Sequence, residues 1–284
     1  RAVYADGRAS GKLFCPADRR VRGMSHLIAS EWYKLRKNGL FRIICFFMVA
    51  AAVIFPLFTY WSYPKDGGSG ITLTGIEMYV NAMMMNQFFL KISLGLLAGF
   101  FISSEYSSGV LKRTVSAGKS RGQVYVSKLM IYSLGVGLTS LLAPVLSVVI
   151  EILMSEAGLL SGFGQPTGIS TIAYVLRTLG FTVLFAAAFA SIAAFAAVIL
   201  ADNGKTIGFS ILFFLFVDQI LHSLGNYVPL FKMVYDYSLF KLFTATIEFR
   251  MDNSDLFLSI VMPAATFAVF ALWGIYIFRR KEIQ

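Results

Sequence analysis

Three ionisable residues lie within or next to long apolar stretches, and ion movement is the chemistry they could serve. They are Lys91, Glu151 and Asp218. A charged side chain is expensive in hydrocarbon, so it usually faces a cavity, a translocation route or a partner of opposite charge. Two hypotheses follow. The three residues line a polar translocation path or ion-coupling site, or they have structural roles, such as an ion pair between Lys91 and Asp218 or snorkelling to the membrane surface.

Other chemistry finds little support in the sequence. The two histidines lie far apart, and neither HExxH nor CxxC occurs. Two tripeptides, at 118–120 and 204–206, imitate the end of a phosphate-binding loop, but Arg113 and Ile199 stand where the first glycine of that loop is required. We therefore expect no catalytic residue, no metal site and no nucleotide-binding site in this chain. Energy for any uphill transport must then come from an ion gradient or from another chain.

The elements that must position these residues are membrane helices. Hydrophobic residues make up 57% of the chain and charged residues only 14%, a composition far from that of a soluble domain. Six apolar runs are long enough to cross the roughly 30 Å of bilayer hydrocarbon as helices, and none alternates as barrel strands do. The predicted fold class is an all-α membrane protein with six transmembrane helices. We place these near 40–60, 82–103, 129–153, 174–200, 207–224 and 256–278.

The distribution of Lys and Arg predicts the orientation, because cytoplasmic flanks are enriched in both. With both termini cytoplasmic, 19 of the 25 basic residues fall on the cytoplasmic side and four fall in outer loops. The net charge of +10 is therefore mostly a topology signal, with attraction to anionic lipid as a secondary role. It does not indicate nucleic acid as a partner.

The N-terminal region is expected to change character at Met24. The residues before it contain no Met and no apolar core, so we expect a non-native or disordered tail. An amphipathic interfacial helix follows, with Ile28, Trp32 and Leu35 on one face. A basic flank that only anchors the first span is the alternative. The predicted organisation is a tail (1–23), an interfacial helix (24–39), a six-helix domain (40–278) and a cytoplasmic C-terminus (279–284).

A polar segment, "EYSSGVLKRTVSAGKSRGQVYVSK", separates the second and third spans. It is the longest predicted cytoplasmic loop between spans, and two to eight residues would be enough to join antiparallel helices. We expect a short helix within it. Either the segment has an additional task, or it is a solvated basic loop that fixes orientation.

This segment resembles the loop after the second helix of type-2 ABC transporter permeases, and "SEWYKLRKNGLF" near the N-terminus is similar to their opening. The order of elements from about residue 25 to 284 most resembles the small six-helix permeases of bacterial peptide-antibiotic exporters, the bacitracin and lantibiotic self-protection group. The sequence departs from the usual pattern at Val110, where the family often has Thr.

The resemblance implies a helical coupling loop that docks into a cytoplasmic ABC ATPase subunit, beside a connecting helix at 26–38. It further implies a permease subunit of an ATP-driven exporter of peptide antibiotics or other amphipathic substrates, in the bacterial plasma membrane. This subunit would work by alternating access, as a dimer with a second permease chain. It would hold no cofactor, and ATP and Mg²⁺ would bind the partner ATPase. The implied coupling residues are Glu105, Gly109, Leu111, Arg121 and Lys128.

An ion-coupled secondary transporter is the alternative function, with Lys91, Glu151 and Asp218 as its site. Such carriers are often built from internal repeats. The halves 24–153 and 170–284 show no convincing repeat. The stretch between the fifth and sixth spans is long and aromatic, and we expect short helices or a structural cap there.

Overall fold

The computed structural model describes residues 16–62, 73–116, 118–166 and 168–281, without the side chains of 16–23, 107 and 112. Residues 1–15 of the predicted tail and the last three residues of the predicted C-terminus lie outside this description. The described residues form helices and turns, with no strand. In chain order the helices are α1 (Pro16–Lys37), α2 (Gly39–Ser62), α3 (Gly75–Leu97), the π-helix η1 (Ala98–Ser103), α4 (Ser104–Ser107), α5 (Val110–Ser116), α6 (Arg121–Glu156), α7 (Thr171–Leu200), α8 (Asn203–Gly225), α9 (Pro229–Asp236), α10 (Leu239–Ala245) and α11 (Asn253–Arg280).

Six stretches of the described chain are long and apolar enough to cross a membrane, which confirms the predicted all-α fold with six transmembrane helices. They are α2, the continuous stretch α3–η1–α4, α6, α7, α8 and α11. At 36 residues, α6 is about 54 Å long. It is therefore longer than the hydrocarbon is thick, and part of it extends past the membrane.

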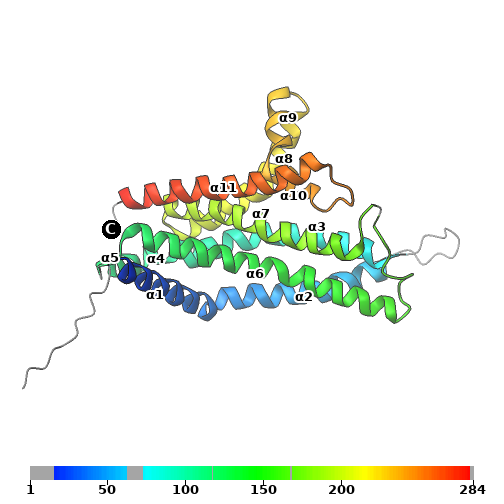
Figure 1. Cartoon of the computed structure of the whole chain (residues 1–284), viewed down its shortest axis with the longest axis horizontal. Helices are drawn as coiled ribbons and strands as arrows, with labels where there is room; N and C mark the ends of the chain where they lie inside the picture. Colours follow the sequence, from blue (N-terminus) through cyan, green and yellow to red (C-terminus); the bar gives the residue numbers. More distant parts are fainter. Residues whose placement is uncertain (1–15, 63–72, 117, 167, 282–284) are drawn as a thin grey trace, which may run out of the picture.

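One end of the bundle gathers α4, α5, the first turns of α6 and the last turn of α11 (Figure 1). We call it the basic end, because these segments and the turn before α6 contribute a series of cations. They are Arg113, Lys119, Arg121, Arg279 and Arg280.

The centre of the bundle is formed by α6 and α7. Helix α6 packs against α1, α2, α3, α7 and α11, and α7 also contacts η1, α8 and α10. Small residues give α7 a face that lets its neighbours approach closely, as packing in lipid requires. All of this face is buried, and it consists of Ala186, Ala190, Ala193 and Ala197.

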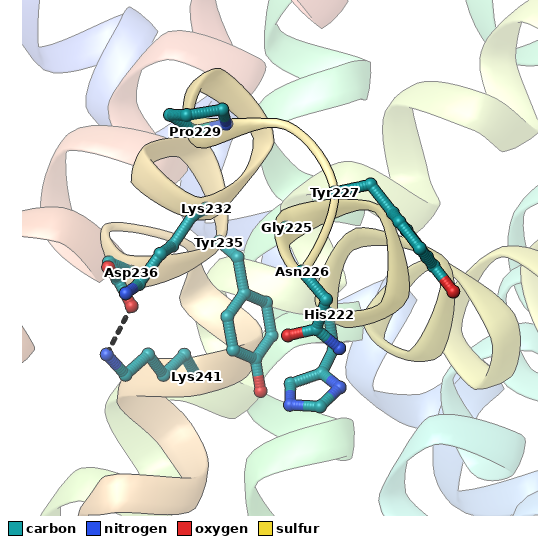
Figure 2. A pocket seen from close by; sticks show the side chains of 9 residues that line it. All are labelled: His222, Gly225, Asn226, Tyr227, Pro229, Lys232, Tyr235, Asp236 and Lys241. Atoms are coloured by element: carbon teal, nitrogen blue, oxygen red, sulfur yellow. Dashed lines mark hydrogen bonds and ion pairs between the residues drawn. The ribbon is translucent and has the colours of Figure 1, made fainter.

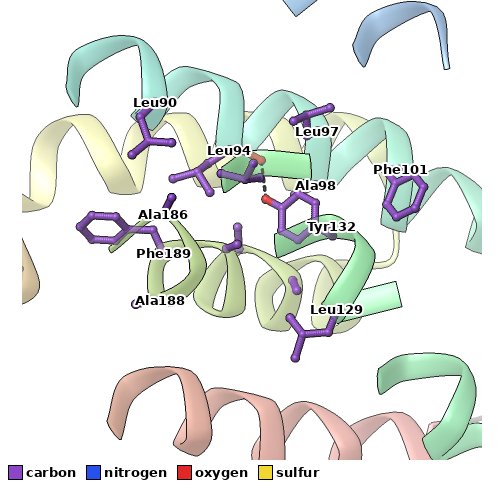
Figure 3. Packing of buried hydrophobic residues seen from close by; sticks show 14 of the residues in the cluster. Leu90, Leu94, Leu97, Ala98, Phe101, Leu129, Tyr132, Ala186, Ala188 and Phe189 are labelled. Atoms are coloured by element: carbon purple, nitrogen blue, oxygen red, sulfur yellow. Dashed lines mark hydrogen bonds between the residues drawn. The ribbon is translucent and has the colours of Figure 1, made fainter. Parts of the chain in front are cut away.

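Figure 3 shows how α3, α6 and α7 meet in the core. Leu90, Leu94 and Phe189 are fully buried in one apolar cluster. Tyr132 of α6 is buried with them, and its hydroxyl donates a hydrogen bond of 2.7 Å to the carbonyl oxygen of Leu94 on α3. The bond satisfies the one polar group that this tyrosine brings into the core.

Two glycines set the distance between the α3–η1 stretch and α8. A Cβ atom at Gly95 would lie 2.9 Å from Cγ1 of Ile211, and one at Gly99 would overlap Ile207. The spacing of these glycines, one turn apart, predicts such a close approach. Helix α8 therefore packs on this side of α3 and η1 with no room for a larger residue.

Between α8 and α11 lie the two short helices α9 and α10, which differ in their surroundings. In α10, Phe240 and Phe243 are buried against Phe185 and Phe189 of α7. Helix α9 has no buried residue and stands away from the bundle (Figure 1). This region thus inserts one short helix into the core and leaves the other outside it.

Candidate functional site

The polar segment between the second and third spans folds into two short helices, α4 and α5. Gly109 joins them with a φ of +68°, and Gly118 follows α5 with a φ of +82°. Both lie in the left-handed region that favours glycine, so each turn depends on its residue type. The seven-residue helix α5 is thereby held between two sharp turns at the basic end.

Four charged side chains meet beneath this segment and form what we call the basic-end charge cluster. Glu31 and Lys34 come from α1, Glu105 from α4 and Lys128 from α6. Lys128 Nζ lies 2.9 Å from Glu31 Oε2 and 2.7 Å from Glu105 Oε2, and the latter contact is an ion pair without hydrogen-bond alignment. Lys34 Nζ lies 2.7 Å from Glu31 Oε1 and 3.0 Å from Glu105 Oε1. Each carboxylate thus contacts both ammonium groups, and the net charge is zero.

The cluster is largely removed from solvent. The side chains of Lys128 and Glu31 are each 3% exposed, that of Glu105 is 12% exposed and that of Lys34 is 37% exposed. Burial by itself favours a raised pKa for Glu31, but Lys128 and Lys34 outweigh it and lower the pKa. Burial likewise opposes the charge on Lys34, yet Glu31 and Glu105 raise its pKa above the ordinary value. Both groups are therefore held in their charged forms.

The structure places most of the predicted coupling residues inside the protein. Leu111 is fully buried and Glu105 and Lys128 nearly so. Arg121 is partly exposed, and its Nη1 donates to the carbonyl oxygens of Arg279 at 3.2 Å and Lys281 at 2.9 Å. These side chains attach the segment to α1, α6 and α11 and leave other residues to form its outer surface.

The outer surface of the segment carries cations that the sequence analysis did not single out. Arg113 on α5 is exposed, and Lys119 in the next turn is partly exposed. Glu31 and Lys34, the partners of Glu105 and Lys128, are also absent from the predicted site residues. A charged pair three residues apart in a helix, within "SEWYK", was the available signal.

Helix α1 packs on α6 through a face adjacent to the predicted one. Leu27, Glu31 and Leu35 are buried, whereas Ile28 and Trp32 are half-buried. A Cβ atom at position 135 of α6, a glycine, would lie 2.7 Å from Cδ2 of Leu35. The helix begins at Pro16, earlier than the predicted residue 24.

The charges inside the bundle separate into a pair and a single residue. Lys91 Nζ on α3 lies 3.2 Å from Asp218 Oδ2 on α8, and it also lies 5.6 Å from the centre of the Phe240 ring. The two charged side chains are 16% and 17% exposed. Glu151 is fully buried on α6, and neither carboxylate oxygen has a hydrogen-bond partner within the described part of the chain. The structure therefore brings Lys91 and Asp218 together and leaves Glu151 apart.

Catalytic and metal chemistry gain no support from the geometry. Residues 118–122 have the GxSxG spacing of a nucleophile elbow, but that motif follows a strand, and here α5 precedes it. Ser120 is instead the N-cap of α6, where its Oγ accepts a hydrogen bond of 3.3 Å from the backbone nitrogen of Gln123. Among the described residues, no group of three or more His, Cys, Asp or Glu is placed to hold a metal ion.

Comparison with known proteins gives one family match. A family model described as ABC-2 family transporter protein matches residues 27–219, from α1 to most of α8. The match covers more than half of the chain and includes the basic-end charge cluster, α5 and the Lys91–Asp218 pair. Among curated proteins, no significant match was found.

Proposed function

Because this chain belongs to the ABC-2 family of transporter proteins, we propose that it is the membrane-spanning permease subunit of an ATP-driven exporter. Permeases of this family are the membrane component of ABC transporters and work with an ABC ATPase subunit. ATP and Mg²⁺ would bind in that separate subunit. The proposed cargo is a peptide antibiotic or another amphipathic or lipid-like molecule.

The observation that carries the coupling mechanism is the buried charge cluster. It connects α4 directly to α1 and α6, because Glu105 contacts both Lys34 and Lys128. Removing one member would leave a charge buried without its partner, which is strongly unfavourable. Displacement of α4 and α5 by a partner would therefore move α1 and α6 with them, as a rigid body.

The docking surface proposed for the ATPase is the exposed side of α5 with the turn that follows it. Arg113 and Lys119 make this surface positive, so an acidic groove on the ATPase would complement it. This surface would face the cytoplasm of a bacterial cell, with both chain termini on the same side. The predicted coupling residues Glu105, Leu111, Arg121 and Lys128 then position the surface, and Gly109 shapes the turn into it.

Transport by alternating access is proposed to need a second permease chain, identical or related. Large apolar side chains on α2 are strongly exposed, including Phe46 at 76%, Phe58 at 65% and Trp61 at 84%. Contiguous apolar surface of this kind contacts lipid or another membrane helix. A cavity between two permease chains would then open to each membrane face in turn.

Co-purification with the cognate ABC ATPase tests this function. R113E/K119E reverses two charges on the proposed docking surface, and we expect it to reduce co-elution and stimulated ATP hydrolysis at least about tenfold, as loss of charge-assisted contacts would. Exposed substitutions of this kind change stability by only about 0.5 kcal/mol, so the permease should remain folded. K205E is the matched control, because Lys205 is an exposed cation in the first turn of α8.

Two outcomes would contradict the proposal. Co-elution that survives R113E/K119E would exclude the α5 surface as the docking site. A permease that elutes alone and transports only down an imposed ion gradient would instead favour the ion-coupled alternative, with the mostly buried Lys91–Asp218 pair as the first site to study. Family membership favours the ATP-driven function.

A further inference from the structure

A cavity of about 680 Å³ lies at the end of α8 that is far from the basic end. Helices α8, α9 and α10 form its walls, and the cavity opens to the exterior of the protein. Figure 2 shows its polar side chains converging from these elements. They are His222, Asn226, Lys232, Tyr235, Asp236 and Lys241.

The frame of the cavity is tightly built. A Cβ atom at Gly225 would lie 3.1 Å from Cα of Lys232, so the end of α8 and helix α9 pack almost backbone to backbone. The rings of His222 and Tyr235 meet edge to face, with centroids 5.3 Å apart and an interplanar angle of 74°. These contacts fix α9 relative to α8, so the cavity is formed without a ligand.

The charges in the cavity are not balanced. Lys241 Nζ pairs with Asp236 Oδ1 at 2.5 Å, whereas the ammonium group of Lys232 has no hydrogen bond or ion pair among the described residues. The hydrogen bond from Lys241 lowers the pKa of Asp236, and the nearby charge of Lys232 contributes. Asp218, one turn before His222, is paired with Lys91. One ammonium group therefore remains without a counter-ion.

The position of the cavity indicates what kind of anion could reach it. Gly225 is the last residue of a membrane-spanning helix, so the cavity lies where lipid headgroups meet the hydrocarbon. Tyr227 lines the cavity and is 85% exposed, and on α9 Leu230 is 66% exposed and Met233 61% exposed. Aromatic and apolar groups of this kind are typical of the membrane interface.

We propose that this cavity binds the phosphate group of an anionic amphiphile, with Lys232 as its principal cation. His222, Asn226 and Tyr235 supply further polar groups. The acyl chains contact the apolar rim. Lys241 also contacts the phosphate group when its ion pair with Asp236 opens. This inference does not depend on the proposed function, because it concerns binding by the permease chain alone.

Native mass spectrometry of the purified full-length chain from an uncharged detergent tests the proposal. The probes are phosphatidylglycerol and phosphatidylcholine with the same acyl chains, which differ in net charge. We expect preferential retention of phosphatidylglycerol, and a loss of about tenfold in K232Q, the scale of a charge-assisted contact. The matched control K205Q removes an exposed lysine at the basic end and should retain the lipid as the wild type does.

A second variant separates lost binding from lost folding. D236N removes the carboxylate that competes for Lys241, so it should raise phosphatidylglycerol retention above that of the wild type, a gain that misfolding does not produce. Equal retention of the two lipids, or equal losses in K232Q and K205Q, would overturn the proposal. Displacement of the lipid by inorganic phosphate at equal concentration would also overturn it, since the site would then recognise a free anion.

Discussion

The basic-end charge cluster and the Lys91–Asp218 pair use the same chemistry in different environments. In the cluster, two carboxylates and two ammonium groups contact one another, and the Lys128 and Glu31 side chains are each only 3% exposed. The Lys91–Asp218 pair has a single contact of 3.2 Å between side chains that are 16% and 17% exposed. A closed, buried network fixes the helices that share it, whereas a single pair between less completely buried side chains opens at a lower cost. The charges therefore hold the basic end more firmly than they hold α3 to α8, where close packing at Gly95 and Gly99 joins the helices instead.

Replacing Lys128 with Met should have the largest effect, because it breaks the closed network. Glu31 and Glu105 would remain buried with only Lys34 between them, and loss of one partner of a buried ion pair costs about 3–5 kcal/mol. The measurement is the free energy of unfolding of the purified chain in detergent. K128M/E105Q should recover part of the loss, because it removes the excess negative charge, and K205M is the control. Unfolding of K128M at the wild-type midpoint would show that the cluster does not hold the basic end together.

Replacing Gly99 with Ala tests whether the rigidity extends into η1, the segment that leads to the cluster. The added Cβ would overlap Ile207 of α8, and overpacking of this kind costs about 1–3 kcal/mol. I207A in the same chain should restore much of the stability, because it clears the space that the new methyl group needs. If G99A/I207A is no more stable than G99A, steric overlap is not the cause.

Replacing Lys91 with Met should have a smaller effect than K128M, although both remove a lysine from an ion pair. We expect a loss of about 1–3 kcal/mol, because the pair is a single contact and its side chains are less completely buried than those of Lys128 and Glu31. The same unfolding measurement gives the comparison, and D218N should behave similarly. A loss as large as that of K128M would show that the pair and the charge cluster stabilise the fold equally.

The charge cluster should make the stability of the chain independent of pH around neutrality. The stability should fall at acidic pH and at alkaline pH, which we call the acid limb and the alkaline limb. The pKa of Glu31 is lowered, so its contribution is present above the ordinary glutamate pKa and is lost as the pH falls through the lowered value. The pKa of Lys34 is raised, so its contribution is present below the ordinary lysine pKa and is lost as the pH rises through the raised value. Melting temperatures measured across pH should therefore stay level through neutrality. E31Q should weaken the acid limb, and an unchanged acid limb in E31Q would assign it to other groups.

Sequence alone could predict the six spans and a close helix approach at Gly95 and Gly99, although not that α8 is the helix that approaches. Both follow from local rules, since hydrocarbon demands long apolar helices and small residues allow helices to meet. The ABC-2 resemblance rested on two short motifs and is also confirmed. The Lys91–Asp218 contact was one of the alternatives left open, because periodicity does not say which helix faces meet.

The charge cluster could not be predicted, because its partners are remote in the sequence. Glu31 and Lys128 are 97 residues apart, and Lys34 and Glu105 are 71 apart. Their meeting depends on how α1 packs against α6, which no local pattern encodes. The cavity beside α9 depends in the same way on a fold-back after Gly225, and no local pattern encodes its shape.

The length of α6 has a mechanical consequence. This helix of about 54 Å carries Lys128 near the basic end, Tyr132 in the core and Glu151 near its other end. If it tilted as a rigid rod about its middle by about 5°, each end would move by roughly 2 Å in opposite directions. Such a lever arm transmits a small displacement at the basic end to the far side of the membrane without breaking any of the hydrogen bonds within the helix.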